Sequence, residues 1–291
     1  MQLSLNAVKL TIATALLSLI SFSASANDFC QQNLLPILKQ AYPTATALTN
    51  NDGEPYQLQL DDKYKRSIDL GFSSQAVCKV WPAKPELTLL AVKLDYYEEE
   101  QLGWAASTAD LEILVVDTKS KQILARQLLV DALFSDAISV DSIALDTARY
   151  HLNDHITAFG VTVKRSSRSG PNPFNSKTLS LFQYDDSQPQ GKQISLLVDS
   201  LIVNQFGGES DTTCAGEFWR TKRIVIINNA KQQAPNLSPL TVKTQVKHFR
   251  STREEDSFDC IDSTIDIKKE TTTLRFDGTQ YPVAKEMRYH F

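Results

Sequence analysis

The sequence is poor in glycine, with 10 among 291 residues, which is about half of what average usage would give. Glycine-rich loops that cradle phosphate groups are therefore not expected in this chain. Histidine is also scarce, with four residues, and none of them lies near a plausible nucleophile. The cysteines are far apart in the sequence, whereas a zinc site needs close Cys-x-x-Cys pairs. We therefore expect no metal, no cofactor and no catalytic residues.

Long apolar segments are missing beyond residue 26, where no stretch approaches the roughly 20 residues of a membrane-spanning helix. The net charge of −4 gives no reason to expect a nucleic-acid partner. The first residues are different, because Lys9 precedes a short apolar run at 10–20 and the small residues Ala24-Ser25-Ala26 follow. This order predicts a signal peptide over 1–26 that is cleaved after Ala26. A retained membrane anchor is the alternative interpretation.

The mature chain keeps the cysteines Cys30, Cys78, Cys214 and Cys260. An even number of cysteines in an exported protein indicates disulfides, and four cysteines allow three pairings. We favour Cys30–Cys78 and Cys214–Cys260 because each pair closes a local loop. Each bridge should stabilise the fold by about 3–4 kcal/mol on the chain-entropy model. The signal and the cysteines together predict a periplasmic or secreted protein.

Strand-like segments rich in leucine and β-branched residues fill most of the chain. A first set lies at 87–94, 111–117, 122–129 and 139–150. A second set in the same order lies at 156–163, 178–185, 192–198 and 218–227. A third begins at 240–246 and continues through 264–268 to a hairpin at 274–281, where Asp277-Gly278 is a strong two-residue turn.

This recurring order predicts an all-β protein built from repeated four-stranded meanders, arranged like the blades of a propeller. The units would cover 86–154, 155–230 and 236–291, after an N-terminal helix and short strands within 27–85, all in one domain spanning 27–291. The helix is expected over 28–41. The repeat spacing is uneven, at about 70 and then 85 residues. A β-sandwich of two packed sheets therefore stays open as the second interpretation.

Three connections, at 95–110, 164–174 and 248–260, are longer than the roughly 2–5 residues that a hairpin needs. If the units superpose, these connections emerge on one face. They combine aromatic residues with arginines, which is typical of protein interfaces. The candidate binding residues are Tyr96, Tyr97, Trp104, Arg165, Arg168, Phe174, Phe249, Arg250 and Arg253.

These observations predict a binding protein that recognises an envelope protein or a cell-wall glycan. The alternatives are a secreted hydrolase that uses loop carboxylates such as Asp95, Glu99 and Asp256, and a structural subunit of the envelope. His151 and His155 have a spacing that holds metals on helices, but they flank a turn between strands and are not expected to bind one.

Overall fold

The computed structural model describes residues 26–71, 75–96, 107–227, 237–254 and 259–289. In these ranges the chain forms one α-helix, a short 3-10 helix and two antiparallel sheets of seven strands each. The prediction of an all-β protein with a short N-terminal helix is confirmed. The predicted signal peptide lies outside the described residues, apart from Ala26, at which the helix begins.

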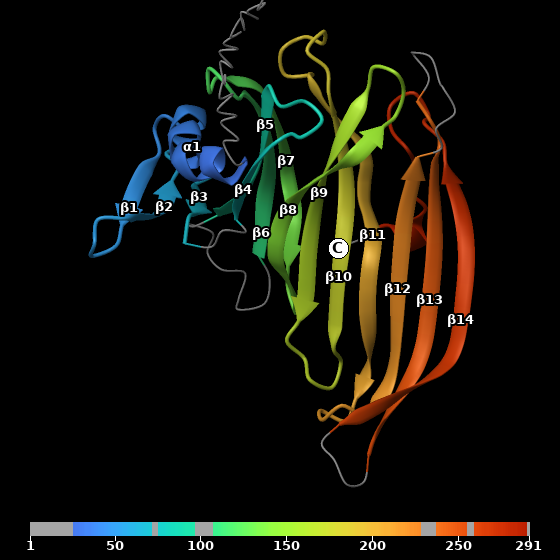
Figure 1. Cartoon of the computed structure of the whole chain (residues 1–291). Helices are drawn as coiled ribbons and strands as arrows, with labels where there is room; N and C mark the ends of the chain where they lie inside the picture. The colour runs from blue at the N-terminus through green and yellow to red at the C-terminus, as the bar shows by residue number, and fades with distance from the viewer. Residues whose placement is uncertain (1–25, 72–74, 97–106, 228–236, 255–258, 290–291) are drawn as a thin grey trace, which may run out of the picture.

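The first sheet, sheet A, is formed by the N-terminal half of the chain and is covered by helix α1 (Ala26–Ala41) (Figure 1). Its strand order is β1-β2-β3-β5-β6-β7. The seventh strand, β4, is outside this order and pairs only with β5. The strands are β1 (Thr46–Thr49), β2 (Pro55–Gln59), β3 (Arg66–Asp69), β4 (Ala76–Val80), β5 (Leu87–Tyr96), β6 (Ser107–Asp117) and β7 (Ile123–Ser135).

The second sheet, sheet B, is a continuous meander in which every strand pairs with its neighbour in sequence. Its strands are β8 (Ile138–His151), β9 (Thr157–Ser167), β10 (Phe174–Tyr184), β11 (Ile194–Ser210), β12 (Gly216–Ile227), β13 (Leu240–Arg253) and β14 (Cys260–Leu274). Most of these strands are long, and β14 forms one edge of the sheet (Figure 1).

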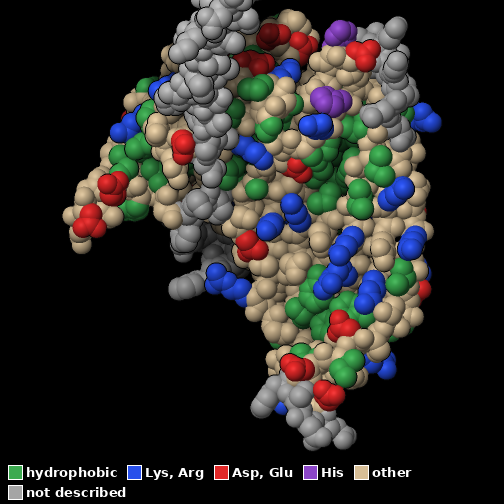
Figure 2. Space-filling model, viewed as in Figure 1, with side chains coloured by type: hydrophobic (Ala, Val, Ile, Leu, Met, Phe, Trp, Pro, Cys, Tyr) green, Lys and Arg blue, Asp and Glu red, His purple; other side chains and the backbone are tan. Residues whose placement is uncertain are grey.

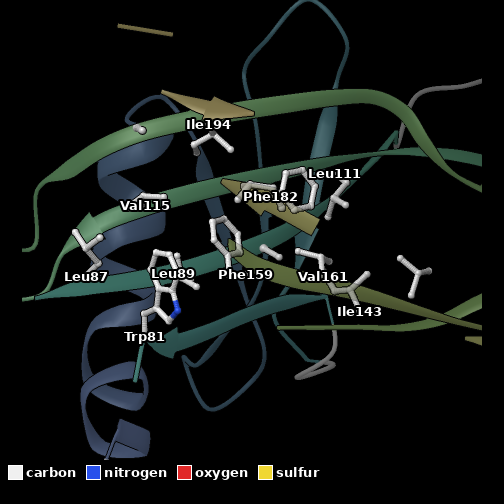
Figure 3. Close-up of a cluster of buried hydrophobic side chains, with 14 of the residues drawn as sticks. Trp81, Leu87, Leu89, Leu111, Val115, Ile143, Phe159, Val161, Phe182 and Ile194 are labelled. Atoms are coloured by element: carbon white, nitrogen blue, oxygen red, sulfur yellow. The ribbon is translucent and has the colours of Figure 1, made fainter. Parts of the chain in front are cut away.

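The two sheets share a core in which alternate residues of β5 and β6 face sheet B. Figure 3 shows Phe159 among the side chains of this core; its ring centroid lies 5.3 Å from that of Trp81, and Phe182 stacks on it at 5.7 Å. The intervening residues of β5, such as Leu90 and Leu94, face the opposite side and pack in the cluster that includes α1. The run at 87–94 is apolar at nearly every position because both faces of β5 are buried.

The C-terminal segment packs against β11 and includes the 3-10 helix Lys285–Met287. The amide of Tyr281 donates to the carbonyl of Leu197 at 2.7 Å, and the amide of Tyr289 donates to the carbonyl of Ser200 at 3.0 Å. The predicted hairpin over 274–281 is wrong, because β14 ends at Leu274 and only the turn after it forms. The segment instead contributes Tyr281 and Met287 to a core cluster, which fixes its path.

The strands do not form separate four-stranded blades. The first predicted unit, 86–154, is divided between the sheets, since β5 to β7 belong to sheet A and β8 belongs to sheet B. The strands of the second and third units run together into sheet B. Both predicted disulfides are confirmed, with Cα–Cα distances of 5.6 Å for Cys30–Cys78 and 6.0 Å for Cys214–Cys260.

Candidate functional site: a basic face on sheet B

Lysines from four strands line up in a single row across sheet B. Residues that pair directly across neighbouring strands lie on the same face of a sheet. One row of such pairs runs from β9 to β14 through Lys164, Lys177, Asn204, Lys222, Gln245 and Lys269. At about 4.8 Å per strand, this row is about 24 Å long. It contains no carboxylate.

A second row lies two residues further along the strands on the same face. It runs through Ser166, Asn175, Phe206, Arg220, Lys247 and Ile267. On the other side of the first row, Ile224 pairs with Lys243, which pairs with Thr271. We call the surface formed by these rows the basic face, and its cations are Lys164, Lys177, Arg220, Lys222, Lys243, Lys247 and Lys269.

Phenylalanines lie beneath part of the basic face. Phe206, Phe218 and Phe249 come from β11, β12 and β13, and their neighbouring ring centroids are 5.6 and 5.5 Å apart. The guanidinium of Arg220 lies 5.7 Å from the ring of Phe206, and Lys247 Nζ lies 5.1 Å from the ring of Phe249. Such contacts hold a cation over the negative face of a ring. The aromatic row therefore orients these cations at the surface.

The cations are accessible from solvent. Most are exposed, and Lys177 and Lys247 are half-buried. Within the described ranges, none of them forms an ion pair with a carboxylate. Figure 2 shows lysine and arginine side chains gathered over the part of the sheet where β10 to β13 lie, with hydrophobic side chains between them. A hollow of about 680 Å³ is lined by Lys222, Lys243 and Lys269, among others.

The arrangement is unfavourable for folding at one point. Lys164 and Lys177 are directly opposite each other on β9 and β10, and like charges in such positions destabilise a sheet. A chain with a net charge of −4 nevertheless concentrates positive charge here. The surface is therefore suited to attract anionic groups.

Strand alternation produces this surface. On β12, the side chains of Phe218, Arg220 and Lys222 point to the basic face, while Trp219 and Thr221 point to the opposite face. On that opposite face, Trp219 packs against Phe174 with ring centroids 6.5 Å apart.

The structure separates the candidate residues that the sequence indicated. Phe249 lies in the aromatic row of the basic face, at 4% exposure. Phe174 packs on Trp219, and Arg250 pairs with Glu217, both on the opposite face. Arg253, at the end of β13, and Arg168, in the connection after β9, are exposed.

Arg165 was expected in an exposed connection, but it lies within β9 and is 2% exposed. Its guanidinium stacks 4.3 Å from the ring centroid of Tyr289 and lines a cavity of about 610 Å³ between the sheets. Burial lowers the pKa of Arg165 below its usual value. The expected connection is shorter than predicted because β9 continues to Ser167, so Arg165 and Lys164 lie on opposite faces.

Among the candidates of the first connection, Tyr97 and Trp104 lie outside the described residues. Tyr96 is half-buried, and its hydroxyl donates to Asp110 at 2.7 Å. Burial and this hydrogen bond raise the pKa of its phenol. Tyr96 therefore has a structural contact inside sheet A, away from the basic face.

The second and third connections end at the same end of sheet B, because each links an odd-numbered strand to the next strand of the meander. The hairpin between β11 and β12 lies beside them, since the amide of Ser210 donates to the carbonyl of Pro171 at 2.8 Å. The Cys214–Cys260 disulfide joins this hairpin to the start of β14. This linked end of sheet B borders the basic face near the phenylalanines.

Two carboxylates that sequence reasoning did not single out lie deep in sheet A. Asp110 and Glu112 are 1% and 3% exposed. Arg66 donates to Asp110 at 2.8 Å, Arg126 donates to Glu112 at 2.7 Å, and the hydroxyl of Tyr42 also donates to Glu112. Their signal in the sequence is the charged pair that interrupts the apolar run of β6. These contacts hold α1 and β3 to the sheet.

Within the described ranges, no group of three or more His, Cys, Asp or Glu side chains is placed to hold a metal ion. In the same part of the chain, no helix is both long and apolar enough to cross a membrane. Comparisons with protein families, with curated proteins and with solved structures found no match.

Proposed function

We propose that this protein is an exported binding protein that recognises a polyanionic component of the cell envelope through the basic face of sheet B. The observation that carries the proposal is the row of Lys164, Lys177, Lys222 and Lys269 across the sheet, without a carboxylate among its members. A flat array of cations on a rigid sheet suits a chain of repeated negative charges better than one small anion.

The physical chemistry of the face supports this choice. Side chains in neighbouring strands are about 5 Å apart, so successive anionic groups of a polymer can each meet a different cation. Individual exposed ion pairs contribute only about 0.2–1 kcal/mol, so useful affinity requires several of them at once. The two disulfides are consistent with an oxidising compartment outside the cytosol.

The proposal keeps the class of function that the sequence suggested and moves the contact surface from long connections to a sheet face. The hydrolase alternative places its chemistry on carboxylates such as Asp95, which pairs with Lys93 at 2.7 Å; Glu99 and Asp256 lie outside the described residues. A hydrolase would shorten its polymer, whereas a binding protein leaves the polymer length unchanged.

Binding of the mature chain to polygalacturonate and to polyphosphate, with neutral dextran as the control polymer, tests the proposal. The triple variant Lys177→Gln, Lys222→Gln, Lys269→Gln removes three cations of the row. At low salt we expect its affinity to fall about tenfold, as three lost exposed ion pairs would produce. Binding of the unaltered chain should weaken steeply as salt is added, because exposed charges are screened.

A matched control carries Lys63→Gln, Lys119→Gln and Lys192→Gln, which are exposed lysines outside sheet B's rows. This variant has the same net charge as the test variant, so a general loss of positive charge affects both equally. We expect the control to bind nearly as well as the unaltered chain. Equal losses in both variants, or no salt-dependent binding to either polyanion, would contradict the proposal.

A further inference from the structure

Strand β14 forms an open edge of sheet B. It is 15 residues long and pairs with β13 from one end to the other. On its other side, no described strand pairs with it, and it lies at the outer margin of the sheet (Figure 1). Such an edge offers a full set of backbone donors and acceptors to another strand.

The side chains of β14 are unusual for an edge that stays free. Ile261, Ile265 and Ile267 are 55%, 58% and 46% exposed. Long edge strands with exposed apolar residues favour pairing with another strand. Lysines on an edge oppose unspecific pairing, and β14 carries Lys268 and Lys269. A partner strand must therefore avoid placing like charges opposite each other.

A second copy of β14 offers an opposite charge to Lys268 in an antiparallel register centred on Ile267. In a symmetric antiparallel pair, one residue faces its own copy on the two-fold axis. Centring the pair on residue 266, 268, 269 or 270 would place Asp266, Lys268, Lys269 or Glu270 opposite itself, which is repulsive. Centring it on Ile267 places two isoleucines in contact and brings Asp266 opposite Lys268 on both sides of the axis.

The rest of the strand fits this register. Ile265 is the extra residue where the pairing with β13 shifts, since Asp266 faces His248 and Thr264 faces Phe249. Beyond this bulge the new pairing moves by one residue, so that Ser263 faces Glu270 of the second copy. The register uses nearly the whole length of β14, whereas registers centred on the threonines at 271–273 pair a shorter stretch.

We propose that two copies of this chain pair through β14 in this register and form a dimer with one continuous antiparallel sheet. The two-fold axis of such a pair is perpendicular to the sheet, so the same face of both copies points to the same side. Ile267 belongs to the basic face, and the two basic faces therefore join across the axis. A polymer that spans both would bind by avidity; this consequence rests on the proposed function, but the dimer does not.

Charge reversal tests the register. The variants Asp266→Lys and Lys268→Asp each replace two opposite-charge contacts with two like-charge contacts. Each variant alone should raise the dimer dissociation constant at least about fivefold, as measured by sedimentation velocity at low salt. An equimolar mixture of the two restores complementary pairs and should form heterodimers about as tightly as the unaltered chain.

Cross-linking gives a second measurement. The variant Ile267→Cys places its thiol opposite its own copy, so oxidation should produce a covalent dimer. The control Ile224→Cys carries its thiol on the same face, at an isoleucine 64% exposed on β12 and away from the axis, and should form no covalent dimer. Circular dichroism of each variant verifies the fold.

A chain that sediments as a monomer up to its solubility limit, and whose Ile267→Cys variant forms no disulfide, would overturn the proposal. So would a mixture of the two charge variants that associates no better than either variant alone. A dimer that forms as expected but binds polyanions no better than a monomeric variant supports the pairing and contradicts only the avidity. A dimer that binds no polyanion supports the pairing and contradicts only the proposed function.

Discussion

Replacing Lys177 with glutamine should make the protein more stable and a poorer binder. Lys177 lies directly opposite Lys164 in the pairing of β10 with β9, where Cβ atoms are about 4.5–5.5 Å apart. Like charges at this separation cost roughly 0.2–1 kcal/mol. Glutamine keeps most of the length of the lysine side chain, so packing of the half-buried stem changes little. We therefore expect the free energy of unfolding to rise by about 0.2–1 kcal/mol.

Urea unfolding at low and at high salt measures this effect. For a chain of this size the gain corresponds to a rise in Tm of up to about 4 °C. The gain should shrink at high salt, because salt screens the repulsion that the substitution removes. The variant Lys192→Gln changes an exposed lysine in the turn between β10 and β11 and is the matched control. Its stability should be nearly unchanged.

The same Lys177→Gln variant should bind polygalacturonate less tightly than the unaltered chain. Opposite effects on stability and binding are expected where a surface is shaped by function at a cost in stability. A loss of stability on substitution, or a gain that does not depend on salt, would refute the reasoning. A loss would mean that Lys177 stabilises the sheet through its stem, and a gain independent of salt would mean that charge repulsion is not its cause.

Three further predictions concern the framework. Replacing Cys30 and Cys78 with alanine should cost about 4 kcal/mol in unfolding free energy, because the bridge closes a separation of 48 residues; equal urea midpoints for the two forms would contradict this. Tyr42→Phe should cost about 1–2 kcal/mol by removing the hydrogen bond to buried Glu112. Burial and the charge of Glu112 raise the pKa of Tyr42 in the folded protein. The free energy of unfolding should therefore decline as the pH rises above about 10, and it should decline less in Tyr42→Phe. The same decline in both proteins would contradict this prediction. Gly207→Ala should cost about 1–3 kcal/mol, since its Cβ would lie 2.7 Å from an indole carbon of the facing strand; an unchanged thermal midpoint would show that the indole moves freely.

The amino-acid pattern alone was sufficient for the all-β class, the N-terminal helix and both disulfides. Those features depend on local signals. The apolar run at 87–94 indicates a strand buried on both faces, and β5 is such a strand. Each cysteine is paired with its nearest partner in the sequence, at separations of 48 and 46, as the closure of short loops favours.

The grouping of strands depends on contacts that the local pattern does not contain. The sequence pattern predicts that β5 to β8 form one unit. In the structure, β7 is the last strand of sheet A and β8 is an edge strand of sheet B. The apolar residues of all these strands satisfy both arrangements, because burial against a facing sheet and burial within a blade require the same residue types. In the observed arrangement, Trp81 and Phe159 pack against each other in the core that the two sheets share.

The candidate site depends on register in the same way. The sequence predicts Arg165 in a connection, but the alternation of side chains along β9 places Arg165 between the sheets and Lys164 on the surface. Lys177, Lys222 and Lys269 are far apart in the sequence and meet in one row only through the pairings of β9 to β14. The sequence by itself determined that the chain forms strands and where its bridges close. Tertiary structure decided which face each cation occupies, because a shift of one residue in register exchanges the two faces of a strand.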